Sequence, residues 1–191
     1  MRRSLFLIAL VAVLASIAGP ALTQQKAQTP APKPAGGPAE EALVMWNSIS
    51  RKLIAMAEDF PEAKYDFKPK PEVRTFAEQL LHVAGTNYVL LSAIKGTQIG
   101  PGTEDPPRQT YKTKADVVAL LKKSVEEGAA LIKEMGDAGI TTAVKFPYGN
   151  RMVSGSFCIM EAAEHAGEHY GQLVVYYRIN GIVPPASRQQ Q

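Results

Sequence analysis

Three histidines are the residues of this chain best suited to do chemistry together. His165 and His169 lie four residues apart in the string EHAGEH, which starts at residue 164, and His82 is the only other histidine. On a helix, a spacing of four puts both rings on one face, one turn apart. Two such imidazoles can bind one divalent ion, and a third ligand from another helix would leave a coordination position open for water. The same spacing also occurs in histidines that only form hydrogen bonds, and by itself it favours that structural interpretation.

Glu168 is the acidic residue to weigh as a catalytic base beside these histidines. The string His165-x-x-Glu168-His169 matches the inverted zinc-protease pattern, in which a glutamate between two ligands acts as base. That class needs a third ligand on a later helix, and the 22 residues after His169 contain no Asp, Glu or His. A protease of this class is therefore disfavoured. Glu168 remains the one catalytic candidate, although its position on the helix fits a solvated carboxylate better.

Other groups near the histidine pair could close a metal site. Gln172, three residues after His169, and Glu161, four before His165, are the nearest candidates for a fourth ligand that would make the site structural. Cys158 shares the face of His165 but lies seven residues away, about 10.5 Å along a helix, which is too far to bind the same ion. We expect Cys158 to be a core thiol.

Four segments with helical periodicity must position these residues. They cover roughly residues 40–60, 75–95, 113–136 and 156–180. Thr75 and Thr113 each open a capping box, in which the threonine hydroxyl and an acidic side chain three residues later satisfy free backbone amides. Gly96 and Gly181 follow the second and fourth segments as C-terminal stops. No convincing pair of strands is predicted, and only residues 144–146 have extended character.

These segments predict an all-α protein that folds as a four-helix bundle. The connection of residues 96–112 can span about 55 Å when extended, whereas a 20-residue helix is about 30 Å long. The second and third helices can therefore be parallel and joined by a crossed connection. His165 and His169 border the apolar face of their helix, but His82 lies about 120° from the centre of the apolar stripe on its own helix. His82 is thus the least well placed of the three and can face a different neighbour.

Length and composition restrict the class of protein. The 191 residues are 46% hydrophobic and 20% charged, which suits one domain with an ordinary core. The formal net charge is +3, and removal of Arg2 and Arg3 with an N-terminal leader would leave 19 basic against 18 acidic residues. A nucleic-acid partner is disfavoured because phosphate binding normally requires a larger basic excess. The single cysteine excludes an intramolecular disulfide and a multi-cysteine metal site.

The N-terminus has the pattern of a secretory signal. A basic start precedes an apolar run over residues 5–18, and the small residues that follow suit cleavage before Gln24 or Leu22. We therefore expect residues 1–23 to be a cleavable signal peptide, with an uncleaved anchor as the less favoured alternative. The mature protein is then periplasmic or secreted.

The rest of the chain divides into three parts. Residues 24–38 are rich in proline and alanine, a composition that predicts a disordered linker. The helical bundle covers residues 39–182. Residues 183–191 form a C-terminal tail, since the pair Pro184-Pro185 cannot continue a helix.

The strings around the histidines resemble the DinB/YfiT-like family of metalloenzymes. FAEQLLHV, which starts at Phe76, contains His82, and EHAGEHYGQL contains the other two histidines, with YRING near the end of the last helix. The resemblance covers about residues 40–180. It implies a four-helix bundle with crossed connections. It also implies that His82, His165 and His169 bind a divalent metal, most often zinc or nickel, with positions open to water or substrate.

The resemblance also directs the expected function. Some relatives are transferases or isomerases that use a low-molecular-weight thiol, but an exported protein is separated from cytosolic thiol pools. We expect a metal-dependent hydrolase or transferase that acts on an unidentified small molecule. The alternative is a non-catalytic bundle that binds a ligand or partner and holds a structural or vestigial metal. We expect no nucleic-acid partner and no stable membrane insertion after signal removal, and we allow for a homodimer.

Overall fold

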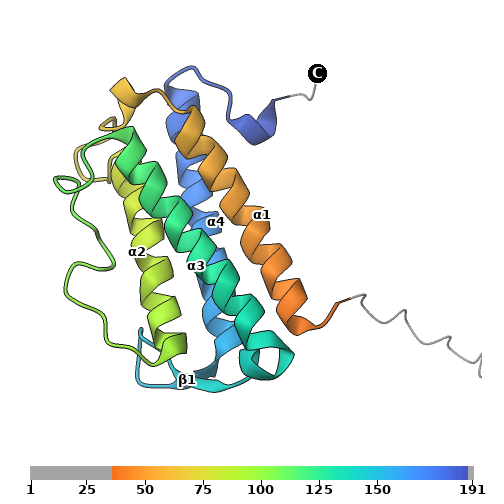
Figure 1. Ribbon diagram of the computed structural model, residues 1–191. Coiled ribbons are helices and arrows are strands. Elements are labelled where there is room, and N and C mark those ends of the chain that lie inside the picture. Colours follow the sequence, from red (N-terminus) through yellow and green to blue (C-terminus); the bar gives the residue numbers. More distant parts are fainter. Residues whose placement is uncertain (1–35, 189–191) are drawn as a thin grey trace, which may run out of the picture. The chain divides into compact units, whose positions relative to one another are not determined.

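The four segments with helical periodicity are helices in the structure (Figure 1). The computed structural model describes residues 36–188, so the predicted signal peptide and most of the predicted linker lie outside the described residues. The long helices are α1 (Pro38–Asp59), α2 (Phe76–Lys95), α3 (Lys114–Ile140) and α4 (Gly155–Ile179); the short elements are η1 (Glu62–Lys64), β1 (Ala143–Lys145), β2 (Met152–Ser154) and η2 (Pro185–Ser187). The predicted all-α four-helix bundle is confirmed. None of the described helices is both long enough and apolar enough to cross a membrane.

Local sequence explains where the central helices begin and end. At the start of α2, the backbone N–H of Glu78 donates to Thr75 Oγ1 at 3.2 Å, and the backbone N–H of Thr75 donates to Glu78 Oε2 at 2.7 Å. Thr113 and Asp116 form the same reciprocal pair at the start of α3. After α2, Gly96 adopts a left-handed conformation with φ of 66°. Both predicted capping boxes and this predicted stop are therefore present.

The end of α3 and the segment after it differ from the prediction. The backbone of Gly136 leaves the helical region, with φ of 56° and ψ of −171°, yet one further turn continues to Ile140. β1 and β2 then pair antiparallel, with Val144 opposite Val153. The prediction of no strand pair was wrong, because strands of three residues are too short to show an alternating pattern in the sequence.

The connection between α2 and α3 crosses the bundle lengthwise. Figure 1 shows α2 and α3 running in the same direction, with residues 96–112 returning along the outside of the bundle. The two helices are in contact at their middles, where the side-chain amide of Asn87 on α2 donates to the hydroxyl of Ser124 on α3 at 3.1 Å. Gln79 near the start of α2 donates to Gln172 near the end of α4 at 2.9 Å, so these two helices are antiparallel. The crossed connection therefore lets α2 pack against both α3 and α4.

Two apolar clusters fill the interior of the bundle. One cluster lies nearer the β1–β2 hairpin, and its last residue on α4 is Ala162. The other lies nearer η1, and its first residue on α4 is Ala166. His165 therefore lies where the two clusters meet, and His169 lies one turn further along α4, between Ala166 and Leu173 of the second cluster. The large side chains of the clusters include Phe60, Phe76, Leu80 and Tyr177 in one, and Trp46, Leu90, Ile132 and Phe146 in the other.

Gly128 in the middle of α3 has a packing reason. A Cβ at this position would lie 2.1 Å from Cζ2 of Trp46, which is only 2% exposed. The indole Nε1–H of Trp46 donates to the carbonyl oxygen of Val125 at 3.0 Å. The glycine, which disfavours a helix by about 1 kcal/mol relative to alanine, thus makes room for the largest side chain between α1 and α3.

Candidate metal centre

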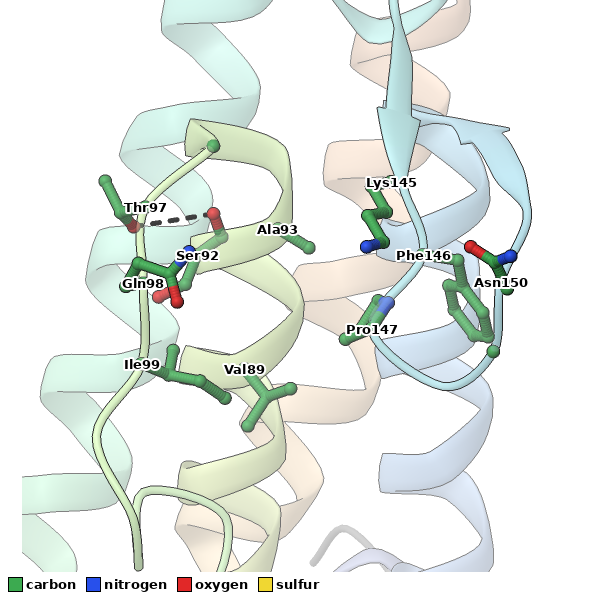
Figure 2. Close-up of a pocket in the computed structure, with 12 residues that line it drawn as sticks. Val89, Ser92, Ala93, Thr97, Gln98, Ile99, Lys145, Phe146, Pro147 and Asn150 are labelled. Carbon is green, nitrogen blue, oxygen red and sulfur yellow. Dashed lines mark hydrogen bonds between the residues drawn. The ribbon is translucent and has the colours of Figure 1, made fainter.

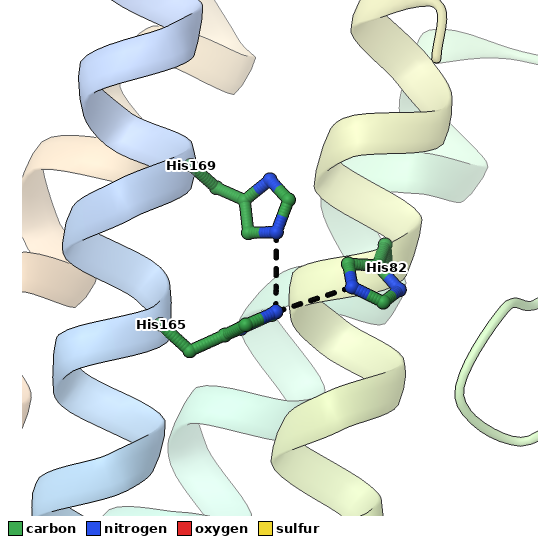
Figure 3. Close-up of side chains that lie close together, drawn as sticks. All are labelled: His82, His165 and His169. Carbon is green, nitrogen blue, oxygen red and sulfur yellow. Dashed lines mark hydrogen bonds between the residues drawn. The ribbon is translucent and has the colours of Figure 1, made fainter. Parts of the chain in front are cut away.

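Antiparallel packing of α2 on α4 brings the three histidines together (Figure 3). His82 extends from α2 toward His165 and His169, which lie on successive turns of α4. Nε2 of His165 lies 3.1 Å from Nε2 of His82 and 3.1 Å from Nε2 of His169. One nitrogen atom from each of the three rings lies within 4.8 Å of the corresponding atoms of the other two rings. Among the described residues, no carboxylate oxygen or thiol sulfur lies within 4.8 Å of all three nitrogens.

The position of His82 corrects one expectation. Because it lies far from the centre of the apolar stripe on α2, the sequence allowed a different neighbour for it, and that inference was wrong. α2 contacts α3, α4 and the connection that follows it, and 14 of its 20 residues are buried. Apolar residues on α2 therefore face several neighbouring elements, and the centre of its apolar stripe does not indicate which side of the helix faces α4.

Side chains outside the cluster hold two of the rings by their Nδ1 atoms. Nδ1–H of His82 donates to Oδ1 of Asp105 at 2.9 Å. Nδ1–H of His169 donates to Oε1 of Gln79, whose amide nitrogen donates in turn to Gln172. With their Nδ1 atoms occupied in this way, both rings direct Nε2 toward the centre of the cluster. Such outer partners commonly orient histidines that bind metal.

His165 completes the pattern with a buried nitrogen that has no partner. Its Nδ1 makes no hydrogen bond to any of the described residues. The Nε2 atoms of His82 and His169 are acceptors, so a proton on Nε2 of His165 accounts for the two 3.1 Å contacts. A cation bound by the three rings would take the place of this proton and accept all three Nε2 lone pairs. The donor set therefore fits a divalent metal that prefers nitrogen ligands.

Burial keeps two of the rings in the form that binds metal. Burial, followed by the charges of His82 and Arg74, lowers the pKa of His165 to about 4. Burial, followed by the charges of the other two rings, lowers the pKa of His169 to about 3. Both rings are therefore neutral at pH 7, and the neutral imidazole is the metal ligand.

A polar pocket of about 350 Å³ lies directly beside His82. Burial works to raise the pKa of Asp105 on its rim, but the charges of His82 and Arg74 outweigh burial and lower that pKa below its usual value. Of the three histidines, His82 alone lines this pocket. The lining residues are Glu72, Val73, Arg74, Glu78, His82, Asp105, Pro106, Pro107, Arg108 and Gln109.

A second, larger cavity of about 450 Å³ contains none of the histidines. Figure 2 shows this cavity between the C-terminal end of α2 and the turn that joins β1 to β2. On the α2 side, Thr97 Oγ1–H donates to the carbonyl oxygen of Ser92. On the other side, the turn carries Phe146 and Pro147. Val89 and Ile99 contribute further apolar surface. We therefore place the candidate site at the histidine cluster beside the smaller pocket, which His82 lines.

The remaining candidates from the sequence lie outside the cluster. Glu168 is exposed, and its charge raises the pKa of the neighbouring exposed Glu164. Gln172 does not join the histidines, because its side-chain oxygen accepts from Gln79. Glu161 is partly buried and also lies outside the group. Cys158 is fully buried, and burial raises the pKa of its thiol, so the expected core thiol is confirmed.

The sequence did not identify Gln79 and Asp105. Gln79 lies three residues before His82, on a neighbouring face of the same helix, so its spacing could have suggested a role. Asp105 lies 23 residues after His82 in an irregular connection, and no local pattern links the two.

Comparisons with known proteins agree with this fold. The model of the DinB superfamily matches residues 45–173. A DinB-like protein from Bacillus cereus is 22% identical, with a TM-score of 0.65 over 76% of this chain and 95% of that one. YfiT from Bacillus subtilis, described as a probable metal-dependent hydrolase with an unusual four-helix bundle topology, is 12% identical, with a TM-score of 0.55 over 75% of this chain and 88% of that one.

An enzyme with a stated reaction shares the same fold. A mycothiol-dependent maleylpyruvate isomerase is 16% identical, with a TM-score of 0.59 over 71% of this chain and 60% of that one. No curated protein matches the sequence. The family match covers more than half of the chain, and the solved structures share its helical arrangement. The resemblance seen in the sequence is thereby confirmed: the chain belongs to the DinB superfamily.

Proposed function

We propose that this protein binds one divalent metal ion through His82, His165 and His169 and uses it to hydrolyse a small molecule. The convergence of three Nε2 atoms, with two of the rings held from outside by Nδ1, carries this proposal. Zinc and nickel are the ions we expect. Such an ion would act as a Lewis acid and lower the pKa of a coordinated water. The description of YfiT as a probable metal-dependent hydrolase supports the same chemistry.

The chain's own residues would hold the metal-binding rings in place and provide a pocket for the substrate. Gln79 holds the His169 ring, and Asp105 contacts the His82 ring. The pocket beside His82 is lined mainly by charged and polar groups, including Arg74, so it suits a polar substrate better than an apolar one. No described carboxylate or thiol is placed to fill a fourth coordination position, which favours an open site over a structural one.

A thiol-dependent transfer reaction is the second candidate. The fold shared with a mycothiol-dependent isomerase favours it, and the cluster would then bind the sulfur of a small thiol co-substrate. Export weighs against it, since such thiols are concentrated in the cytosol. The thiol dependence of the reaction distinguishes the candidates, because a transferase needs the added thiol as co-substrate whereas a hydrolase turns over without it.

We also propose that the chain is exported and processed. The basic start, the apolar run and the small residues before Gln24 support cleavage of residues 1–23. In a Gram-negative host, the intact mass of the periplasmic protein should correspond to a chain that begins near Gln24 or Leu22. Full-length protein in the cytosol would contradict this proposal.

Metal content tests the site directly. Purified mature protein should contain or take up about one ion per chain, measured by elemental analysis and calorimetry with zinc and nickel. Alanine variants of His82, His165 and His169 should lose this ion. Glu168→Gln, on an exposed position of the same helix, should retain it. Unchanged metal content in the three histidine variants would disprove the assignment.

An open coordination position separates an enzyme from a binding module. Azide should change the visible spectrum of the cobalt-loaded protein if exogenous ligands reach the ion. Hydrolysis of a chromogenic ester should be lost on metal removal and restored on addition. An unresponsive spectrum, together with unfolding on metal loss, would instead support a non-catalytic bundle with a structural metal.

A further inference from the structure

The crossed connection touches α2 closely at one glycine. A Cβ at Gly85 would lie 2.2 Å from the carbonyl oxygen of Glu104 and 2.4 Å from that of Thr103. A larger side chain would therefore push this part of the connection away from the helix. Gly85 is three residues after His82, so the two are neighbours on the helix surface. The close approach thus carries the next residue of the connection, Asp105, to the side of His82.

The Asp105 carboxylate joins His82 to Arg74. Its Oδ1 accepts from Nδ1–H of His82 at 2.9 Å and from Nη2–H of Arg74 at 3.0 Å. The side chain of His82 is 11% exposed, whereas that of Asp105 is 61% exposed. The carboxylate therefore reaches a nearly buried ring from the rim of the polar pocket.

We propose that Asp105 is a positioning residue for His82 and that Gly85 permits its approach. This inference rests on the proposed metal site. A carboxylate that accepts from Nδ1–H keeps the ring proton on Nδ1, so the lone pair of His82 stays on Nε2 and is directed toward the other two rings. The same hydrogen bond makes Nε2 a stronger ligand for a metal ion. His82 is the ligand that comes from a different helix, so its ring orientation decides whether α2 and α4 share one ion.

Metal affinity of matched variants tests this role. Asp105→Ala should raise the Kd for zinc about tenfold, the low end of the effect of outer partners, because the carboxylate is largely exposed. Asp105→Asn keeps an acceptor without the charge and should raise Kd less. Gly85→Ala should also raise Kd, although it leaves the carboxylate in the chain. Asp66→Ala is the control: Asp66 pairs with Arg108 and is 70% exposed, and its Kd should stay at the wild-type value.

The tautomer of His82 provides a readout that a general loss of stability would not change. In the metal-free wild-type protein, ¹⁵N chemical shifts should show the proton of His82 on Nδ1, and in Asp105→Ala it should move toward Nε2. Circular dichroism verifies that the variants fold. If Asp105→Ala does not fold, Gly85→Ala, which pushes the connection and its carboxylate away from the ring, carries the same test.

The outcomes separate this inference from the proposed function. Wild-type Kd and tautomer in folded Asp105→Ala, or in Gly85→Ala where Asp105→Ala does not fold, would overturn the positioning role and leave the metal site intact. An equal rise of Kd in Asp66→Ala would also overturn it, because the effect would then be common to exposed carboxylates. A wild-type protein that binds no ion would overturn both proposals.

Discussion

Mild acid should destabilise the metal-free protein, because two of its histidines are neutral when folded. In the unfolded chain, His165 and His169 have the ordinary pKa of about 6.5. In the folded protein, burial lowers these values to about 4 and about 3. Below about pH 6.5 the unfolded chain therefore takes up protons that the folded protein does not bind, and the free energy of unfolding decreases. This contribution to stability is present above pH 6.5 and is lost as the pH falls toward 4.

The size of the effect follows from the pKa shifts. At about pH 4.5 each ring is two units below its unfolded pKa, which corresponds to about 2.7 kcal/mol per ring. Because His165 is only partly buried and the two rings lie in contact, we reduce the sum to about 2 to 3 kcal/mol. Carboxyl groups with lowered pKa titrate mainly below this range; they are Asp59, Asp105 and Asp116.

Urea unfolding of the protein in the presence of a chelator measures this loss. The free energy of unfolding should decrease by about 2 to 3 kcal/mol between about pH 7.5 and pH 4.5 in the wild-type protein. The double variant His165→Gln and His169→Gln should lose much less, since it retains His82 and every carboxylate. An equal pH dependence in both proteins would refute the conclusion that these two rings are held neutral.

Gly128 and Gln79 each make one close contact that a substitution can test. Gly128→Ala should lower the free energy of unfolding by about 1 kcal/mol, measured by urea denaturation. The clash with Trp46 costs about 2 kcal/mol, and the gain in helix propensity returns about 1 kcal/mol. The control is Gly171→Ala, which has open space around its Cβ and should be neutral or stabilising. Gln79→Leu should weaken zinc binding at least tenfold in a chelator competition assay, because it removes the buried acceptor that orients His169, and unchanged affinity would contradict that role.

Patterns within one or two helical turns could be interpreted from the sequence. The capping boxes at Thr75 and Thr113 and the stop at Gly96 marked helix ends that the structure contains. The spacing of His165 and His169 placed two rings on one face of a helix. The motifs around the three histidines identified the family, which the family match confirmed. Each of these features depends on residues that are close in the chain, so local sequence was sufficient for them.

Other features depend on residues that only folding brings together. The three-residue strands β1 and β2 are formed by pairing across a turn, not by a pattern within either strand. The orientation of His82 depends on α2 having several neighbours at once, so its own apolar stripe was misleading. Gln79 and Asp105 reach the histidine rings only because α4 and the crossed connection pack against α2. The sequence by itself determined which residues could bind a metal, and tertiary packing decided how they meet, because contacts between distant segments depend on the whole bundle.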